Sequence, residues 1–241
     1  MNTRLLAAGA CLLFTSTLAG CATPGPPTIV LDPGHSGSSA MSVDPLTRLT
    51  DYDYPNSPEM GEVYQIALAV RDRLVHDGYR VVLTKNSATE TVSLRRRADI
   101  ANSAQAALAV SIHSDHGASW PSWGGQVYPQ RVGLYRVNRD GRRISFGNAG
   151  VAATSQRAAA TFASTRSAAE AHRVVVTDAN FTGRAPLASG NIPLVELFAA
   201  VPWVYNEVGA DPAHPSAPLT ADQRARYANG LATSIERAVP R

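Results

Sequence analysis

Short apolar runs alternate with helical patterns through the first half of the chain, and this alternation constrains the fold more than any other feature. Residues 28–32, 80–84 and 107–112 are rich in β-branched and other apolar side chains and have the length of buried strands. Apolar residues at helical spacing follow Pro58, and a second helix is expected over residues 93–104. We therefore expect a single-domain α/β fold with a mainly parallel, twisted sheet and helices on both faces.

The second half of the chain has fewer clear signals. An Ala-rich stretch over residues 149–171 predicts a helix, and Thr220 is a suitable N-cap for the last helix. Residues 192–197 are expected as a buried strand, and the turn-rich residues 37–58 as a long loop. No repeat or linker divides the chain, so residues 28–241 are expected to form one domain.

The first residues of the chain resemble an export signal. Arg4 is followed by an apolar run over residues 5–19, which is too short to span a bilayer. The run leads into Leu-Ala-Gly-Cys at residues 18–21, which resembles the lipobox where a bacterial signal peptidase cuts before a cysteine that becomes lipidated. The plainer alternative is an ordinary signal peptide with a chance cysteine at this place.

From the lipobox we expect residues 1–20 to be a lipoprotein signal peptide, and residues 21–27 to be the lipidated Cys21 with a short spacer. The protein would then be exported and anchored by lipid to the outer face of the plasma membrane, in the cell envelope. Cleavage would remove Cys11 and leave Cys21 as the only cysteine, so we expect no disulfide within the mature chain.

The charge of the chain argues against one class of partner. With 22 Lys and Arg residues against 19 Asp and Glu residues, the formal net charge is +3. The basic residues are scattered, apart from the run over residues 95–97, and form no basic stripe with interleaved aromatic residues. We therefore expect no nucleic acid as a partner, and we expect a monomer.

Side chains capable of chemistry stand where predicted strands end. His35 follows the first strand, His113 ends the third, and Glu59 opens the helix after the first strand. Because sites in open α/β sheets gather at the carboxyl ends of the strands, these groups are candidates for one site. Two imidazoles and one carboxylate are a common zinc set that leaves a position for water. Glu196, in the expected strand over residues 192–197, is a candidate to accept a proton from that water.

Each of these residues also has a plainer explanation. A single His after a strand is commonly a hydrogen-bonded polar residue, and the helix dipole favours Glu59 in a first helical turn. Glu196 is harder to explain, because its neighbours are apolar and a buried carboxylate is costly unless it is paired or bound to a metal. The sequence contains no His-Glu-x-x-His string, which removes the commonest zinc protease signature.

Six short motifs occur in a fixed order along the chain. They are Ile-Val-Leu-Asp-Pro-Gly-His (29–35), Pro-Glu at a helix start (58–59), Arg-Ala-Asp-Ile-Ala-Asn (97–102), Ser-Ile-His (111–113), Pro-Leu-Val-Glu (193–196) and Arg-Tyr-Ala-Asn-Gly-Leu (226–231). Together they resemble the zinc-dependent N-acetylmuramoyl-L-alanine amidases, the Amidase_3 family, and in particular its compact, single-domain mycobacterial members. Any one string is weak, but their order over residues 28–238 is specific.

This resemblance implies hydrolysis of the amide bond between N-acetylmuramic acid and L-alanine in peptidoglycan. It also implies that His35, Glu59 and His113 bind Zn²⁺ and that Glu196 is the catalytic acid and base. Glu62 is a second candidate ligand. We prefer Glu59, because it fits the family spacing and lies on the apolar stripe of its helix, from which Glu62 is about 60° away.

Further candidates surround this expected centre. Asp32 is a candidate for fixing the tautomer of a ligand histidine, although a turn residue is an equal alternative. His116 and Arg184 are candidates for contacts to substrate, Arg184 through a carboxylate. The tryptophans either line a wall that stacks on sugars or pack in the core; they are Trp120, Trp123 and Trp203.

The chain departs from the family directly after Glu196. Where the family usually continues with glycine, this chain has the bulkier residues 197–203. The departure leaves an alternative open, a degenerate amidase-fold lipoprotein that binds cell wall or peptide without cleaving it.

Overall fold

The computed structural model of the protein describes residues 25–114, 124–177, 194–209 and 217–241. In chain order the elements are β1 (Thr28–Pro33), β2 (Ala40–Val43), β3 (Thr50–Asp53), α1 (Ser57–His76), β4 (Arg80–Leu83), α2 (Leu94–Ser103), β5 (Leu108–Ser114), β6 (Gly125–Pro129), β7 (Leu134–Val137), β8 (Arg143–Phe146), α3 (Ala149–Glu170), β9 (Val174–Val176), α4 (Leu194–Phe198), β10 (Trp203–Val208) and α5 (Ala221–Ala238).

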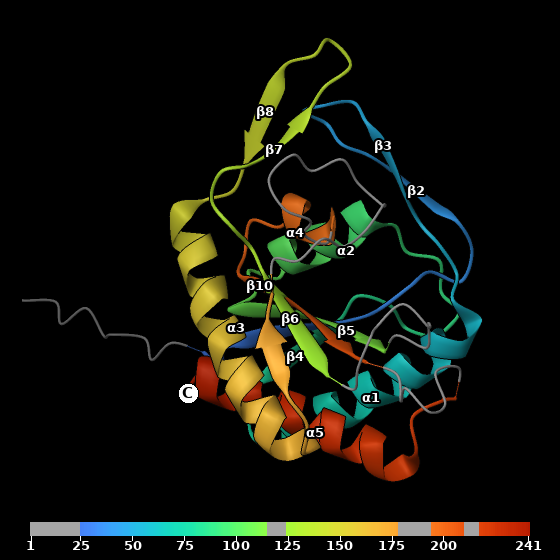
Figure 1. The fold of residues 1–241 in the computed structure, drawn as a ribbon, viewed down its shortest axis with the longest axis vertical. Coiled ribbons are helices and arrows are strands. Elements are labelled where there is room, and N and C mark those ends of the chain that lie inside the picture. The colour runs from blue at the N-terminus through green and yellow to red at the C-terminus, as the bar shows by residue number, and fades with distance from the viewer. Residues whose placement is uncertain (1–24, 115–123, 178–193, 210–216) are drawn as a thin grey trace, which may run out of the picture.

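A six-stranded sheet forms the centre of the molecule, in the order β4-β1-β5-β10-β6-β9 (Figure 1). The strands β4, β1, β5 and β10 are parallel to one another, and β6 joins β10 in antiparallel pairing. The helices α1, α3 and α5 pack against one face, while α2 and α4 lie over the other (Figure 1). The expected α/β class with a mainly parallel sheet is confirmed.

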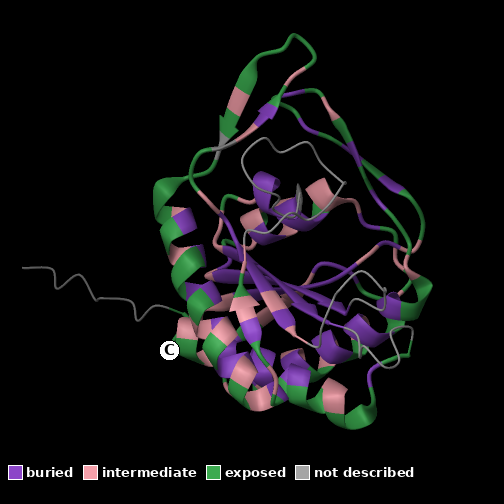
Figure 2. Ribbon diagram, in the orientation of Figure 1, coloured by how far each residue is buried: buried purple, intermediate pink, exposed green. Residues whose placement is uncertain are grey.

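The core lies on both faces of this sheet, because successive side chains of a strand point to opposite sides. On β1, Ile29 and Leu31 pack with the helices α1, α3 and α5, and Val30 packs with α2 and α4. All three side chains are fully buried, in the interior that Figure 2 shows in purple. In the described part of the chain, no helix combines the length and apolar composition that crossing a membrane requires.

Local capping explains where two of the helices begin. The Ser93 side chain accepts a hydrogen bond from the backbone of Arg96 at the start of α2. At the start of α5, Thr220 and Gln223 form a capping box, in which each side chain bonds the backbone of the other. These caps satisfy backbone N–H groups that a helix leaves without partners in its first turn.

The long loop expected over residues 37–58 contains a two-stranded hairpin, β2 and β3, so this part of the prediction is wrong. The hairpin buries one face of alternating residues and exposes the other. Its buried face carries Asp51 and Asp53, which form ion pairs with Arg136 and Arg97. The usual alternation of buried apolar and exposed polar residues is therefore absent, and the sequence pattern does not predict these strands.

The buried strand expected over residues 192–197 is also wrong, since Leu194–Phe198 is the short helix α4. The place beside β5 in the sheet is taken by β10, over Trp203–Val208. A short apolar run does not distinguish a buried strand from a buried helical turn by its periodicity. Which of the two segments becomes a strand depends on which one fills the position beside β5 when the whole chain folds.

Candidate metal centre and active site

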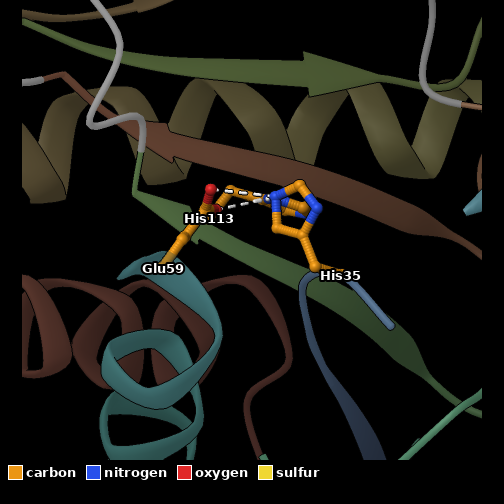
Figure 3. Close-up of side chains that lie close together, drawn as sticks. All are labelled: His35, Glu59 and His113. Atoms are coloured by element: carbon orange, nitrogen blue, oxygen red, sulfur yellow. Dashed lines mark hydrogen bonds and ion pairs between the residues drawn. The ribbon is translucent and has the colours of Figure 1, made fainter. Parts of the chain in front are cut away.

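Three predicted ligands come together at the carboxyl edge of the sheet (Figure 3). His35 follows β1, Glu59 lies in the first turn of α1, and His113 is near the end of β5. Their potential ligand atoms all lie within 4.8 Å of one another. Two imidazoles and a carboxylate that converge in this way have the chemistry of a three-residue site for a divalent metal ion.

Glu59 is the central member of the cluster. One of its carboxylate oxygens lies 2.8 Å from His35 Nε2, and the other lies 2.9 Å from His113 Nδ1. The same carboxylate accepts hydrogen bonds from the Asn56 side chain at 2.7 Å and the Ser114 backbone at 2.9 Å. Burial would raise the pKa of Glu59, but the hydrogen bonds from the two histidines outweigh it and lower the pKa. The carboxylate is therefore held ionised, as a metal ligand must be.

The Nε2 atom of His35 faces the Glu59 carboxylate and is the ring nitrogen that can act as a ligand. Its Nδ1 donates to the carbonyl oxygen of Tyr54 at 3.1 Å, which sets the tautomer and the ring orientation. Its backbone is in the left-handed region, with φ of 58°, a conformation that costs about 1–3 kcal/mol unless the surroundings support it. Two buried cations, Lys85 and Arg97, support this conformation.

Lys85 and Arg97 bind the backbone that carries His35. The ammonium group of Lys85 donates to the carbonyl oxygens of Gly34 at 3.0 Å and His35 at 2.9 Å. Arg97 donates to the carbonyl of Pro33 at 2.8 Å and also reaches the carbonyl of His35. Both cations are buried, so these hydrogen bonds replace the water that each would otherwise require.

Gly34 is required by close packing within the centre. A Cβ atom at this position would lie 2.2 Å from Cε1 of the His113 ring, far inside contact distance. The backbone after β1 therefore passes directly against the imidazole of His113. This explains the glycine in the Asp-Pro-Gly-His motif without any appeal to a positive φ angle.

Asp32 does not contact either ligand histidine through a hydrogen bond that the structure shows, so the predicted tautomer role is not supported. Its carboxylate accepts hydrogen bonds from Thr84 and Arg97, both at 2.6 Å, and from Ser111 at 2.7 Å. Burial would raise its pKa, but the Arg97 charge and these hydrogen bonds lower it. Asp32 thus acts on the centre indirectly, by holding the cation that supports the His35 backbone.

An Arg97→Met variant is expected to lose about 3–5 kcal/mol of unfolding free energy, because Asp32 and Asp53 would remain buried without their cation. In the unchanged protein the lowered pKa of Asp32 gives stability above its ordinary pKa, which is lost in acid. In the variant, burial raises that pKa instead. The difference in stability between the two proteins should therefore shrink as the pH falls below about 5.

Urea denaturation of both proteins across this pH range measures the effect. The matched control is Arg95→Met on the same helix, because Arg95 pairs with Asp99 where both side chains are 39% exposed. That pair should contribute less than about 1 kcal/mol. Equal losses in the two variants would show that the buried network does not support the fold.

Glu62, the alternative ligand, is not a member of the cluster. Its carboxylate accepts hydrogen bonds from the Ser114 hydroxyl at 2.7 Å and from the Leu219 backbone at 2.8 Å. It therefore ties β5 to the segment before α5. The geometry places Glu59 and not Glu62 between the two imidazoles.

Glu196 lies in α4 and not at a strand end. Its side chain is 3% exposed, and neither carboxylate oxygen has a hydrogen-bond partner in the described residues. Burial raises its pKa well above the ordinary value, although the Tyr205 backbone and the Arg131 charge act in the opposite direction. Glu196 is not a member of the cluster formed by His35, Glu59 and His113.

Glu207 is a second carboxylate, which the sequence reasoning missed. It lies near the end of β10, directly opposite His113 of β5 in the parallel register. The Tyr205 hydroxyl donates to its carboxylate at 3.2 Å, and the Tyr205 ring stacks on the His113 imidazole at 4.4 Å between centroids. Two adjacent strands thus bring Glu207 next to the group formed by His35, Glu59 and His113, called the metal-ligand cluster below because it could hold a metal ion.

A sequence signal for Glu207 does exist. A run rich in β-branched and aromatic residues follows Pro202, carries the carboxylate at its penultimate position and stops at Gly209. The polar Asn206 and Glu207 interrupt the apolar pattern, which conceals the strand. All six residues of β10 are nevertheless buried.

Two buried side chains, Tyr227 and Arg166, bind the backbone near the carboxyl ends of β5 and β10. The Tyr227 hydroxyl of α5 faces the carbonyl oxygens of His113 at 3.2 Å and Asn206 at 3.4 Å. Arg166 of α3 donates to the Glu207 carbonyl at 3.0 Å, and its guanidinium lies 4.5 Å over the Tyr227 ring. The two strand ends that carry His113 and Glu207 are therefore fixed by one interior network.

Of the other predicted residues, the structure describes Trp203. Trp203 is fully buried, and its indole N–H donates to the Ser111 hydroxyl at 2.8 Å, so it belongs to the core. Five predicted residues lie outside the described ranges; these are Cys21, His116, Trp120, Trp123 and Arg184.

A family model described as N-acetylmuramoyl-L-alanine amidase, Amidase_3, matches residues 29–237 of the chain. Among curated protein sequences, none matches it. The match spans every residue of the cluster and both candidate carboxylates, Glu196 and Glu207.

Solved structures of amidases have the same fold. The N-acetylmuramyl-L-alanine amidase Ami1 from Mycobacterium smegmatis is 22% identical, with a TM-score of 0.65 over 89% of this chain and 97% of that one. The apo form of Ami1 from Mycobacterium abscessus is 21% identical, with a TM-score of 0.61 over 89% and 99%. The catalytic domain of CwlV from Bacillus (Paenibacillus) polymyxa var. colistinus is 22% identical, with a TM-score of 0.57 over 88% and 97%.

Proposed function

The chain belongs to the N-acetylmuramoyl-L-alanine amidase family, and from this membership we propose that it uses Zn²⁺ to hydrolyse the amide bond between N-acetylmuramic acid and L-alanine in peptidoglycan. The observation that supports this most is the convergence of His35, Glu59 and His113, from three separate elements, at one edge of the sheet. Glu207 on the neighbouring strand adds a carboxylate that is not needed as a ligand.

The three residues fit a zinc ion by their chemistry. His35 offers Nε2, since its Nδ1 is used by the Tyr54 carbonyl, and His113 offers the Nδ1 that faces Glu59. When bound, a zinc ion supplies a Lewis acid that lowers the pKa of water and polarises a carbonyl group. The Glu59 carboxylate, already ionised between the two imidazoles, would hold that charge in a buried place.

Glu207 is the residue to which we assign the proton transfers. As general base it would take a proton from the attacking water, and as general acid it would return that proton to the nitrogen of the departing L-alanine. The Tyr205 hydroxyl orients the Glu207 carboxylate for this purpose. Glu196 remains the alternative carboxylate, but it lies in α4, whereas Glu207 lies on the strand next to His113.

One experiment tests the activity itself. Protein purified after exposure to zinc is expected to contain one zinc ion per chain and to release stem peptides with a free L-alanine amino group from purified peptidoglycan. Chelation should remove both the metal and the release. Zinc without release would instead support the alternative of an amidase fold that binds cell wall without cleaving it.

We further propose that the domain is held at the plasma membrane by lipid on Cys21. Six residues, 22–27, separate Cys21 from Thr28, where β1 begins. The metal-ligand cluster lies beyond the other, carboxyl end of β1. A membrane anchor would therefore enter at the edge of the sheet opposite the centre, which would turn the centre away from the membrane and towards the wall.

A Cys21→Ser variant should move from the membrane fraction to the soluble fraction and lose incorporation of a labelled fatty acid. The reason is that no helix in the described residues can cross a membrane, so anchoring of the domain would depend on the lipid of the modified cysteine. The control is Cys11→Ser, which changes a residue of the expected signal peptide. Membrane association that persists in Cys21→Ser would contradict the anchor.

A further inference from the structure

The outer face of the β2–β3 hairpin gathers large apolar side chains that are open to solvent. Met41 is 59% exposed, Tyr52 is 45% exposed and Tyr54 is 55% exposed. Val43 and Leu46 in the same hairpin are 43% and 60% exposed. These five residues, called the hairpin face below, contrast with the other large exposed apolar residues in the described ranges, which are single valines on separate segments. A gathered apolar surface of this kind usually marks a binding site.

The opposite face of the hairpin is fixed to the body of the protein by ion pairs. Asp51 binds Arg136 with a closest distance of 2.6 Å, and Asp53 lies 3.1 Å from Arg97. Arg97 is the cation that also supports the His35 backbone. The hairpin face is therefore held in a set position relative to the metal-ligand cluster, as a preformed binding surface requires.

The two tyrosines of the hairpin face form a ring pair beside the centre. Their ring centroids are 6.0 Å apart and the ring planes are 28° from parallel. The backbone of Tyr54 is part of the centre, since its carbonyl accepts the hydrogen bond from His35 Nδ1. The aromatic surface thus begins at Tyr54, whose backbone is hydrogen-bonded to a candidate zinc ligand, and continues along β3.

We propose that the hairpin face is a subsite for the glycan strand, on which the rings of Tyr52 and Tyr54 stack against the sugars next to the muramic acid that is cut. This inference rests on the proposed function. The scissile amide joins peptide to sugar, so the glycan must lie against a surface that adjoins the metal centre. N-acetylated sugars are uncharged and present apolar C–H faces, which pack well on aromatic rings.

The charge of the hairpin face agrees with a neutral ligand. The exposed residues of β2 and β3 are Met41, Val43, Thr50 and Tyr52, none of which is charged at neutral pH. The one exposed cation of the hairpin, Arg48, lies in the turn between the strands and not on the strands themselves. Binding of the stem peptide, with its carboxylates, would need cations along the strands, beside the tyrosines. A lipid surface is a poorer fit, because the face follows the carboxyl end of β1, whereas the expected anchor enters at the amino end.

Binding of a peptide-free glycan tests the subsite separately from catalysis. Chitooligosaccharides of four to six sugars contain no amide bond of the type that is cut, so their binding by calorimetry does not depend on hydrolysis. Tyr52→Ala and Tyr54→Ala are each expected to weaken binding by about fivefold to tenfold, and Tyr52→Phe and Tyr54→Phe to restore most of it. Val75→Ala, at a 53% exposed site on α1, is the control and should bind normally.

A second measurement compares substrates of different length. For the Ala variants, the ratio of kcat/KM on long glycan strands to kcat/KM on a single-disaccharide muropeptide should fall about tenfold, mainly through KM. Zinc content should not change, because the backbone carbonyl of Tyr54 is kept. An unchanged ratio with unchanged oligosaccharide binding would overturn the subsite while leaving the proposed activity in place.

Two other outcomes would also overturn it. Loss of binding to anionic phospholipid vesicles in the Ala variants, with oligosaccharide binding intact, would make the hairpin face a membrane surface. Conversion of a dimer to a monomer in sedimentation, again with oligosaccharide binding intact, would make it a self-association surface. If no variant cleaves any substrate but the Ala variants still lose oligosaccharide binding, the subsite stands and the proposed activity fails.

Discussion

A Glu207→Gln variant is expected to lose amide hydrolysis, with kcat about 10²–10⁴-fold below that of the unchanged protein. Glutamine keeps the size of the side chain and can still hydrogen-bond to the Tyr205 hydroxyl, but it cannot carry a proton between water and the leaving nitrogen. Because Glu207 is not a member of the ligand cluster, the zinc content should stay at one per chain. Release of stem peptides and metal analysis on the same preparation measure both quantities.

Glu196→Gln is the matched control for this experiment. Glu196 lies in α4 and not on the strand next to His113, so an amide of the same shape should change kcat by less than about threefold. Circular dichroism would show that both variants are folded. If Glu196→Gln were folded and loaded with zinc but inactive, while Glu207→Gln kept its activity, the role assigned to Glu207 would belong to Glu196.

The second large effect is expected for metal binding in Glu59→Gln. This change removes the negative charge between His35 and His113 and leaves a poorer ligand, so zinc affinity should fall by at least about 100-fold. When zinc is limiting, the rate of hydrolysis should fall together with the zinc affinity. Competition with a chelator of known affinity gives the dissociation constant, and peptide release at rising zinc concentrations shows how far added metal restores activity.

Glu62→Gln separates this effect from general damage to the helix. Glu62 lies one turn further along α1 and accepts hydrogen bonds from Ser114 and Leu219, so its loss should lower stability. Its zinc affinity should remain within about threefold of the unchanged protein, since Glu62 is not a member of the metal-ligand cluster. A fall in zinc affinity for Glu62→Gln, with normal affinity for Glu59→Gln, would exchange the two assignments.

The cluster of His35, Glu59 and His113 was predictable because each residue is tied to a clear local signal. His35 and His113 follow strong apolar strands, and Glu59 stands in the first turn of a helix with a regular apolar stripe. Parallel strands bring their carboxyl ends to one edge of a sheet, so the pairing of β1 with β5 makes the two histidines neighbours. The preference for Glu59 over Glu62 followed from the spacing in the family that the chain resembles and from the helical angle between them, and it agrees with the contacts.

The carboxylate beside the cluster was not predictable in the same way. Two segments, 192–197 and Trp203–Val208, both offer a glutamate within a short apolar run, and such runs do not report whether they become strand or helix. The choice depends on which segment fills the place between β5 and β6, where pairing on both sides favours β10. The paired strands β10 and β5 are nearly 100 residues apart in the chain, so a local sequence pattern cannot indicate that they pair.

By itself, the sequence determined the α/β class, most of the strands and helices before residue 114, and the three residues of the metal-ligand cluster. These depend on periodicity and on the common direction of parallel strands, which are properties of short segments. Only the tertiary structure decided that Glu207 lies beside His113, that Asp32 acts through Arg97, and that the hairpin exposes its apolar face. Each of these depends on which distant partner takes a buried position or charge, and that is settled when the whole chain packs.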